Sequence, residues 1–501
     1  MLTSPARLVA ILAVAAWLAG CTTVGPTFEP PAAPTTRGYT RTALPAATAS
    51  APGPLGRAQA LVTVPRVERD WWREFGSAKL DRLIERAQRD SPTLEAAVAT
   101  LREARQLYAA QAGSTRYPSV DAKLGASREE VNGASIGQPR IPQSTFTLFN
   151  AAVGVSYEFD AFGGNRRALE ALAAQADYRA CLLAGARLTL AANVATTAFL
   201  EAQLGAEIDA TRAILAVERR QLDIARRGER LGTASRADVL ALQTEVDQTR
   251  AGLPPLRNRF ERAAHLLAVL AGRPPGADDL PRFALSDFKV PARLPVVVPS
   301  EVVRERPDVR AASALLHAAT AQYGVAISNL YPHLSLSASL GTAALTTSAL
   351  FGPGSAIWSL AGGLAQPLFN AGLRAGASAA EASMQAVGAN YRQTVLQALR
   401  DVADSLRQVD NDARVLRRET AAYDSARQTL DLVRRQTALG AASTLQSLDA
   451  DRQLQQIRLN VIAARAAKLA DSAALYQAMG GGVLPADPTA IAPRAGAPKA
   501  R

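Results

Sequence analysis

The sequence is poor in the residues that build metal, redox and disulfide sites. Its 501 residues include two cysteines, three histidines and three methionines. A disulfide scaffold needs several cysteine pairs, and a metal site needs ligands clustered at a suitable spacing. The three histidines, His265, His317 and His333, show no such spacing. We therefore expect neither a disulfide-stabilised fold nor a metal site.

A catalytic constellation is also lacking. Residues 133–137 read Gly-Ala-Ser-Ile-Gly and fit the hydrolase pattern G-x-S-x-G. That motif needs a strand before the serine and a helix after it. Here it lies between two expected strands and is followed by Pro139 and Pro142. We interpret it as a surface hairpin loop, and we expect that the protein is not an enzyme.

Long hydrophobic runs are absent after the N-terminal leader, so we expect no transmembrane helix. Membrane β-strands carry a much weaker signal, and a membrane protein therefore remains possible. The formal net charge is +12. Basic residues alternate with acidic ones, as in Glu218-Arg219-Arg220 followed by Asp223, and no dense basic block contains aromatic residues. This favours solvated helix faces over a nucleic-acid partner.

The N-terminus reads as an export signal. Arg7 precedes an apolar run, and residues 18–21 read Leu-Ala-Gly-Cys. We assign residues 1–20 as a signal peptide. Cys21 after Leu-Ala-Gly resembles the lipobox of bacterial lipoproteins, which implies a covalent lipid on Cys21 and no other cofactor. Thr22 stands where an inner-membrane retention signal would carry Asp, which implies sorting to the outer membrane. An ordinary secretory signal with an incidental cysteine is the alternative.

Three segments with little periodicity separate the rest of the chain. Residues 21–69 are rich in Pro, Ala and Thr, and we expect a lipid-anchored N-terminal tether. Residues 273–300 form a Pro-rich linker, and residues 483–501 a disordered tail. The two blocks between them are residues 70–272 and 301–482.

The two blocks repeat one plan. Each reads as a helix, two strands, a very long helix, a turn and a last helix. The turn RLGTAS begins at Arg230 and its near copy ALGAAS at Ala438, so that Leu231 and Leu439 stand 208 residues apart. Gly272 and Gly480, which end the last helices, have the same separation. This constant register predicts an internal duplication.

The long helices are expected over residues 164–231 and 372–439, which contain no proline. Each would be about 100 Å long at 1.5 Å per residue. Such helices need packing partners along their whole length, which predicts coiled-coil contacts. Shorter helices over 93–117 and 236–271 could stack beside one long helix. Pro254-Pro255 should kink the last helix of the first block.

Four segments have the alternation of β-strands with one apolar face: residues 119–127, 147–160, 333–341 and, more loosely, 357–369. Each is close to the length that crosses a bilayer. A half-buried soluble sheet would show the same period. Four strands cannot close a barrel, and open sheet edges cannot face lipid. If these strands span a membrane, several chains must share one barrel.

Several motifs resemble the TolC-like outer-membrane factors, in the lipoprotein branch of the NodT/OprM type. The opening motif is Asp-Trp-Trp-Arg-Glu-Phe-Gly at 70–76, and the mature N-terminus would be Cys-Thr-Thr-Val-Gly-Pro at 21–26. The second block carries Arg-Pro-Asp-Val-Arg-Ala-Ala at 306–312. The resemblance covers residues 18–482. Ser313 and Val483 depart from it, where Glu and Trp are usual.

This resemblance implies an α+β membrane protein that is a homotrimer. Three chains with four strands each would form a 12-stranded β-barrel, and the long helices a periplasmic α-barrel. It implies a passive exit duct in the outer membrane for a tripartite efflux pump, with a periplasmic adaptor and an inner-membrane pump as partners. The alternatives are an exit duct for protein secretion and a structural periplasmic lipoprotein without a pore.

The resemblance also implies site residues. Leu445 and Asp449 match the family's constriction positions near the periplasmic end, where three copies would form an apolar ring and a carboxylate ring. The alternative is that Leu445 packs in the coiled coil and Asp449 is solvated. The turns would be the hairpin tips where the adaptor docks. Four residues mark them, glycines that end the long helices and serines that cap the next ones: Gly232, Ser235, Gly440 and Ser443.

Overall fold

The computed structural model describes residues 23–32, 36, 38–132, 140 and 142–482. The expected signal peptide, Cys21, the loop at 133–137 and the tail at 483–501 lie outside these residues. The chain divides into two compact units. Unit 1 combines residues 1–31, 101–178 and 312–391, and unit 2 combines residues 32–100, 179–311 and 392–501.

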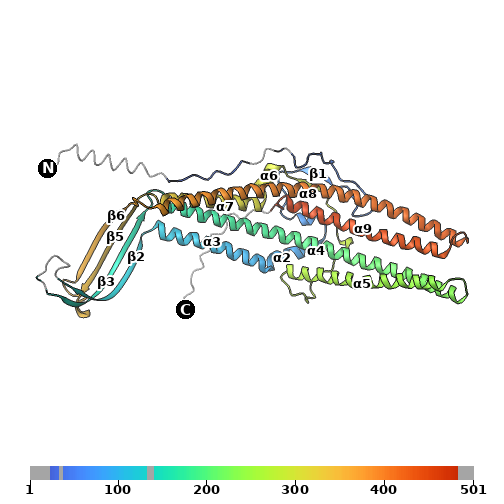
Figure 1. Cartoon of the computed structure of the whole chain (residues 1–501), viewed down its shortest axis with the longest axis horizontal. Helices are drawn as coiled ribbons and strands as arrows, with labels where there is room; N and C mark the ends of the chain where they lie inside the picture. The colour runs from blue at the N-terminus through green and yellow to red at the C-terminus, as the bar shows by residue number, and fades with distance from the viewer. Residues whose placement is uncertain (1–22, 33–35, 37, 133–139, 141, 483–501) are drawn as a thin grey trace. The chain divides into compact units, whose positions relative to one another are not determined.

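Helices account for most of the described chain. In chain order they are η1 (Trp71–Phe75), α2 (Ala78–Asp90), α3 (Pro92–Arg116), α4 (Gly164–Arg230), α5 (Arg236–Leu270), η3 (Leu285–Asp287), α6 (Pro299–Glu305), α7 (Pro307–Ser328), η4 (Thr347–Ala349), α8 (Ala371–Ala438) and α9 (Thr444–Ala478). The two long helices have 67 and 68 residues, as the absence of proline predicts. Figure 1 shows that each long helix is followed by a tight turn and a shorter helix, α5 after α4 and α9 after α8.

Unit 1 contains a four-stranded antiparallel sheet in the order β2-β3-β5-β6 (Figure 1). The strands are β2 (Ser119–Val131), β3 (Ser144–Phe159), β5 (His333–Ala344) and β6 (Ala356–Ala365). They confirm the four strand predictions. The central pairing, β3 with β5, joins the two halves of the chain. Among the described residues, β2 and β6 each have a neighbour on one side only.

The register places the apolar residues of all four strands on one face. Val153 stands opposite Ala122 on β2 and opposite Leu340 on β5, and Leu340 stands opposite Trp358 on β6. The large side chains of this face remain exposed, with Trp358 at 76%. The other face carries small hydroxyl residues, paired in the register Ser119–Ser156–Ser337 and Ser339–Ser359. An exposed apolar sheet face of this size is typical of a membrane or protein contact.

The helices α5 and α4 concern two earlier expectations, the kink at Pro254-Pro255 and the lack of a transmembrane helix. In α5 the helix runs unbroken from Arg236 to Leu270 through Pro254 and Pro255, so the expected kink stays a prediction. By length and composition α4 is apolar enough to cross a membrane, although no uninterrupted apolar run marks it. Since 61% of that window is buried within the protein, α4 also fits a core helix.

The core of unit 2 is built on aromatic side chains. Trp71 stacks on Tyr476 of α9, with ring centroids 5.3 Å apart. Phe75 contacts Phe199 of α4 at 5.0 Å, and Phe199 meets Phe288 edge to face at 4.8 Å. Buried aromatic pairs contribute large apolar areas and specific geometry. The Trp-Trp motif therefore packs in the core and does not form a ligand site.

The N-terminal segment of unit 2 is held against helices rather than left as a free tether. Strand β1 (Ala60–Thr63) pairs in parallel with β4 (Arg293–Val296). The Lys468 ammonium donates to the Arg57 carbonyl at 2.7 Å, and the Gln59 amide donates to the Ser472 hydroxyl at 3.0 Å. The Pro- and Ala-rich composition indicates extended chain correctly, but it gives no sign of this packing.

Candidate functional site

The turn between α4 and α5 is a Schellman motif followed by a capping box. Gly232 has φ +74°, its amide donates to the Glu229 carbonyl at 3.1 Å, and the Thr233 amide donates to the Gly228 carbonyl at 2.8 Å. These two bonds satisfy carbonyls at the end of α4. The Ser235 hydroxyl then accepts from the Asp238 amide at 3.1 Å, and the Asp238 carboxylate accepts from the Ser235 amide.

The turn between α8 and α9 has the same geometry. Gly440 also has φ +74°, and its amide donates to the Thr437 carbonyl at 3.1 Å. The Ser443 hydroxyl accepts from the Gln446 amide at 3.2 Å, while the Gln446 side chain accepts from the Ser443 amide at 2.8 Å. The sequence therefore predicts the conformation of both turns correctly. A left-handed residue and two satisfied helix ends make each turn a rigid tip.

Each turn exposes a leucine. Leu231 is 79% exposed and Leu439 is 84% exposed. The two leucines stand at matching positions of the two repeats, 208 residues apart. The docking role of the four turn residues, Gly232, Ser235, Gly440 and Ser443, remains a prediction.

The expected constriction residues lie on the first turns of α9. Leu445 is 50% exposed, and the Asp449 side chain is 61% exposed. They stand one helical turn apart, so both side chains share a face of the helix. Neither is buried within the chain, which leaves both available to another surface. Their role as a gate also remains a prediction.

An arginine on α9 joins this helix to the other hairpin. One Arg452 nitrogen lies 3.0 Å from a Glu245 carboxylate oxygen on α5, and another lies 3.9 Å from Asp449. Sequence reasoning missed this bridge, because Glu245 and Arg452 belong to different hairpins. All three side chains are at least one-third exposed, so the bridge contributes at most about 1 kcal/mol.

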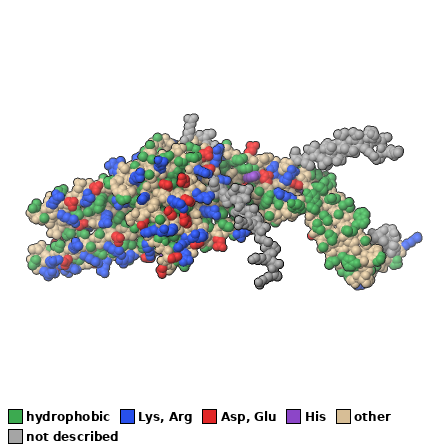
Figure 2. Space-filling model, turned by 180° about the vertical axis from the view of Figure 1, so that it is seen from behind, with side chains coloured by type: hydrophobic (Ala, Val, Ile, Leu, Met, Phe, Trp, Pro, Cys, Tyr) green, Lys and Arg blue, Asp and Glu red, His purple; other side chains and the backbone are tan. Residues whose placement is uncertain are grey.

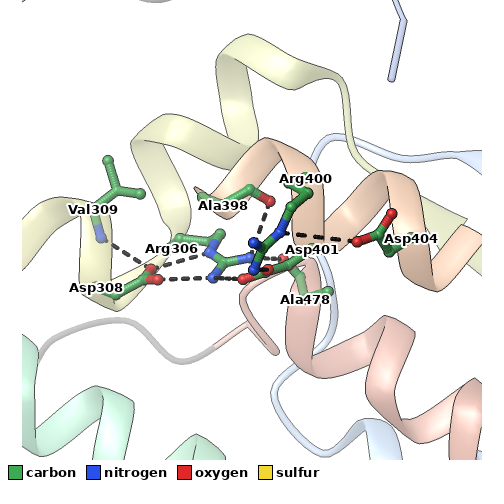
Figure 3. A network of polar contacts seen from close by, with 8 residues as sticks. All are labelled: Arg306, Asp308, Val309, Ala398, Arg400, Asp401, Asp404 and Ala478. Atoms are coloured by element: carbon green, nitrogen blue, oxygen red, sulfur yellow. Dashed lines mark hydrogen bonds and ion pairs between the residues drawn. The ribbon is translucent and has the colours of Figure 1, made fainter. Parts of the chain in front are cut away.

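A second charged cluster surrounds Arg306, the first residue of the Arg-Pro-Asp motif (Figure 3). Its guanidinium contacts Asp308 at 2.7 Å and Asp401 of α8 at 3.3 Å. It also donates to the carbonyls of Ala398 and Ala478 at 3.3 and 2.9 Å. Burial disfavours the charges, but the hydrogen bonds and opposite charges prevail, so the pKa of Arg306 is raised and that of Asp308 lowered. Arg306 thus joins the start of α7 to α8 and to the end of α9.

The first described residues of unit 1 are anchored beside the junction of β3 and α4. The Val24 amide donates to the Phe162 carbonyl at 3.1 Å. The buried Arg167 guanidinium donates to the Val24 and Gly25 carbonyls at 3.2 and 3.1 Å. Gly25 approaches Gly324 so closely that an added Cβ would lie 2.7 Å from its Cα. These contacts fix the chain two residues after Thr22, close to the strand end.

The described part of the chain holds no group of three or more His, Cys, Asp or Glu residues placed to bind a metal ion. His317 instead stacks on Phe28 and lies 2.8 Å from a Glu170 oxygen.

Residues 83–273 and 298–481 match the family model of the outer membrane efflux protein. The match covers most of the chain, and the protein therefore belongs to this family. It is an outer-membrane component of an efflux system.

Two curated relatives and a solved structure extend this result. The chain is 31% identical over 423 residues to the pyoverdine export outer membrane protein OpmQ of Pseudomonas putida, covering 84% of this chain and 89% of that one. It is 28% identical over 472 residues to the solvent efflux pump outer membrane protein SrpC of Pseudomonas putida, covering 93% and 96%. The outer-membrane channel OprN matches with a TM-score of 0.79 at 25% identity, covering 92% and 99%.

Proposed function

We propose that three copies of this chain form a passive exit duct through the outer membrane for a tripartite efflux pump. The observation that carries this proposal is the sheet of unit 1, with one exposed apolar face and two edge strands, β2 and β6. Unpaired edges cannot face lipid, and four strands are too few to close a barrel. Three copies joined edge to edge give 12 strands, with apolar residues outward and hydroxyl residues lining the bore.

The long helices of the same three copies form a periplasmic tunnel that ends at the two tips. Each chain supplies two similar hairpins, so three chains supply six around the axis. The helices are rich in alanine, which allows close helix contacts. A periplasmic adaptor docks on the tips, and an inner-membrane pump supplies the energy. The repeats at 70–272 and 301–482 are the two structural blocks of this arrangement.

A lipid on Cys21 anchors the protein after removal of residues 1–20. The bonds of Arg167 to Val24 and Gly25 support this, because they hold the chain beside the strands that would enter the membrane. A lipid two residues before Thr23 would then reach the bilayer without a long spacer.

Leu445 and Asp449 close the tunnel at its periplasmic end. Three leucines at a narrow axis exclude water, and three carboxylates favour cations. The Arg452 bridge to Glu245 supports a closed state, because it ties the helix that carries both residues to the other hairpin. Opening then requires this bridge and the leucine contact to break together.

The gate is tested with the double variant Leu445→Ala/Asp449→Ala in planar lipid bilayers. The first hairpin carries Ala237 and Ala241 at the matching positions, so the change makes the hairpins alike. We expect single-channel conductance to rise several-fold and cation selectivity to fall. The matched control Leu240→Ala/Asp247→Ala, on exposed positions of α5, should conduct like wild type.

The duct itself is tested by the assembly of the purified protein. Unboiled samples should migrate as trimers in detergent gels and should form ion-conducting pores in bilayers. A monomeric protein that forms no pores would contradict the proposal and would favour a structural lipoprotein. Wild-type conductance in the Leu445/Asp449 double variant would remove these two residues from the gate and leave the duct intact.

A further inference from the structure

The last turns of α4 carry an exposed ridge in which arginines alternate with apolar residues. Arg220, Ile224, Arg227 and Leu231 follow one another at spacings of four, three and four, so they share a face of the helix. All four are exposed. The ridge covers 11 residues, or about 16 Å of helix. It presents two apolar side chains and two cations to whatever docks at this tip.

The matching ridge on the second hairpin is less charged. Residues 219–243 contain six arginines and three acidic residues, a net charge of +3, whereas residues 427–451 contain three of each, a net charge of 0. The apolar positions are kept, as Leu432 and Leu439. Figure 2 shows Lys and Arg side chains gathered along the hairpin of α4 and α5. The two tips therefore share shape and apolar contacts and differ in charge.

Three positions account for the charge difference. Arg220, Arg230 and Arg236 of the first hairpin correspond to neutral residues of the second, 208 residues later: Gln428, Ala438 and Thr444. Arg220 and Arg230 have no acidic partner in the part of the chain that the structure describes. Arg236 reaches Glu229 at 3.4 Å, with its side chain 71% exposed. These cations are consequently available to a partner.

At a fourth position both hairpins carry an arginine, but only the arginine of the second hairpin has an acidic partner. Arg226 donates to the neutral Gln243 side chain at 2.5 Å. Its counterpart Arg434 contacts the carboxylate of Asp451 at 2.8 Å, and Asp451 is largely buried. The positive charge of Arg434 is thus neutralised within the second hairpin, while that of Arg226 is not. Arg227 of the first ridge is paired with Asp223, so the excess positive charge of the first tip comes from Arg220, Arg226, Arg230 and Arg236.

We propose that the first hairpin tip is a docking surface for an acidic helical segment of the periplasmic adaptor, and that the second tip accepts a neutral one. This inference rests on the proposed function. The partner it fits is a helical hairpin with Asp or Glu on one face and small apolar residues between them. Opposite charges across such an interface fix register and speed association, and like charges suppress wrong partners. The two tips are therefore not interchangeable docking sites.

The proposal is tested with designed helical-hairpin peptides that differ only in the docking face, one carrying four Glu residues and the other four Gln residues. Binding to the immobilised full-length protein is measured in 50 mM and 300 mM NaCl. We expect the acidic hairpin to bind at least 10-fold tighter than the neutral one in low salt, and most of this difference to vanish in high salt. Equal binding of the two peptides would overturn the proposal.

The site is tested with the variant Arg220→Gln/Arg230→Ala/Arg236→Thr, which gives the first tip the residues of the second. It should lose at least 10-fold in affinity for the acidic hairpin. A matched control with the same change of net charge is Arg257→Gln/Arg259→Ala/Arg262→Thr, on exposed positions of α5 about 30 Å along the helix from the turn. The control should lose less than 2-fold. An equal loss in both variants would show general charge attraction and overturn the docking surface.

Two further measurements distinguish the docking surface from a lipid site and test it separately from the proposed function. Vesicles containing phosphatidylglycerol should not compete with the acidic hairpin, and strong competition would show an anionic lipid site instead. Drug susceptibility of cells lacking the protein is compared with that of cells carrying the triple variant. If deletion changes susceptibility and the triple variant behaves as wild type, this inference fails and the duct stands. If deletion has no effect, the proposed function fails first.

Discussion

The two halves of the chain have the same backbone plan but stabilise it with different chemistry. Both tips end in a left-handed glycine and a capping box. Both last helices end in a positive-φ glycine, Gly272 packed on Asp90 and Gly480 packed on Arg306. The residue before the proline that opens each block differs, being the neutral Ser91 in the first half and the charged Arg306 in the second. Backbone geometry thus repeats, while the buried polar interactions are particular to one half.

The largest difference lies where each half begins. In the first half the helix α3 follows Ser91-Pro92, and in the second α7 follows Arg306-Pro307. Ser91 is buried. Arg306 holds two carboxylates and two carbonyls. Removing the arginine takes one interaction partner away from Asp308, from Asp401 and from each of the two carbonyls.

We expect Arg306→Ala to lower the free energy of unfolding by about 2 to 3 kcal/mol, because the buried arginine donates to two carbonyls while both of its carboxylate partners are at least 40% exposed. Ser91→Ala, the matching change in the first half, should cost about 1 kcal/mol or less. Denaturant unfolding followed by tryptophan fluorescence would measure both, since Trp71 and Trp72 are buried. Similar losses in the two variants would mean that the halves are equally dependent on these junctions.

The repeated features are the ones that the sequence predicts well. Gly232 and Gly440 adopt left-handed backbone that other residues avoid, and Ser235 and Ser443 bond to amides three residues away. Such features depend on near neighbours in sequence, and local patterns carry them. The strand faces follow for the same reason, because alternation decides which side each residue takes.

The features that differ between the halves depend on distant residues, and the sequence alone does not reveal them. Nothing in the pattern around Arg57 indicates that Lys468 donates to its carbonyl. The bridge between Arg452 and Glu245 joins two hairpins. The apolar periodicity that predicts a helix is blind to such pairs, since each partner looks like an ordinary solvated residue.

The two halves also differ at a position where the second half places two neighbouring carboxyl groups. Asp412 of α8 contacts Asp471 of α9, while the matching residues of the first half are Leu204 and Ala263. Burial, together with the neighbouring carboxyl of Asp471, raises the pKa of Asp412 to about 8. The charged form of Asp412 is disfavoured, because it would be buried beside a like charge.

The sign of the pH effect follows from this shift. A carboxyl whose pKa is raised on folding binds its proton more tightly in the folded state, so stability falls as pH rises from about 4 to about 8. We expect a loss of about 2 to 4 kcal/mol of unfolding free energy between pH 5 and pH 8. Burial lowers the pKa of nearby Lys468 to about 8, which adds stability only above that pH. Burial also raises the pKa of Glu201 and of Glu218, so the contribution of Asp412 is measured as the difference in pH slope between wild type and a variant without it.

The double variant Asp412→Leu/Asp471→Ala gives the second half the residues of the first and so removes this difference between the halves. This variant should be most stabilised relative to wild type at pH 8, and its unfolding free energy should fall less between pH 5 and pH 8 than that of wild type. Asp404→Asn serves as the control, because the Asp404 side chain is 76% exposed. An unchanged pH slope in the double variant would contradict the raised pKa of Asp412.

The smallest expected difference is between the two tips themselves. The first capping box uses Asp238, whose pKa is lowered by the hydrogen bonds from the Ser235 hydroxyl and amide, whereas the second uses Gln446, which does not titrate. A lowered carboxyl pKa stabilises the cap at neutral pH, and this contribution is lost as the pH falls through that value. Spin labels on cysteines introduced at Thr233 and Ala441 would report tip mobility between pH 7 and pH 3. The first label should become more mobile as the pH falls and the second should not, and Asp238→Asn should make the two tips respond alike. Equal acid mobilisation of both labels in the unmodified protein would mean that the capping carboxylate does not control the first tip.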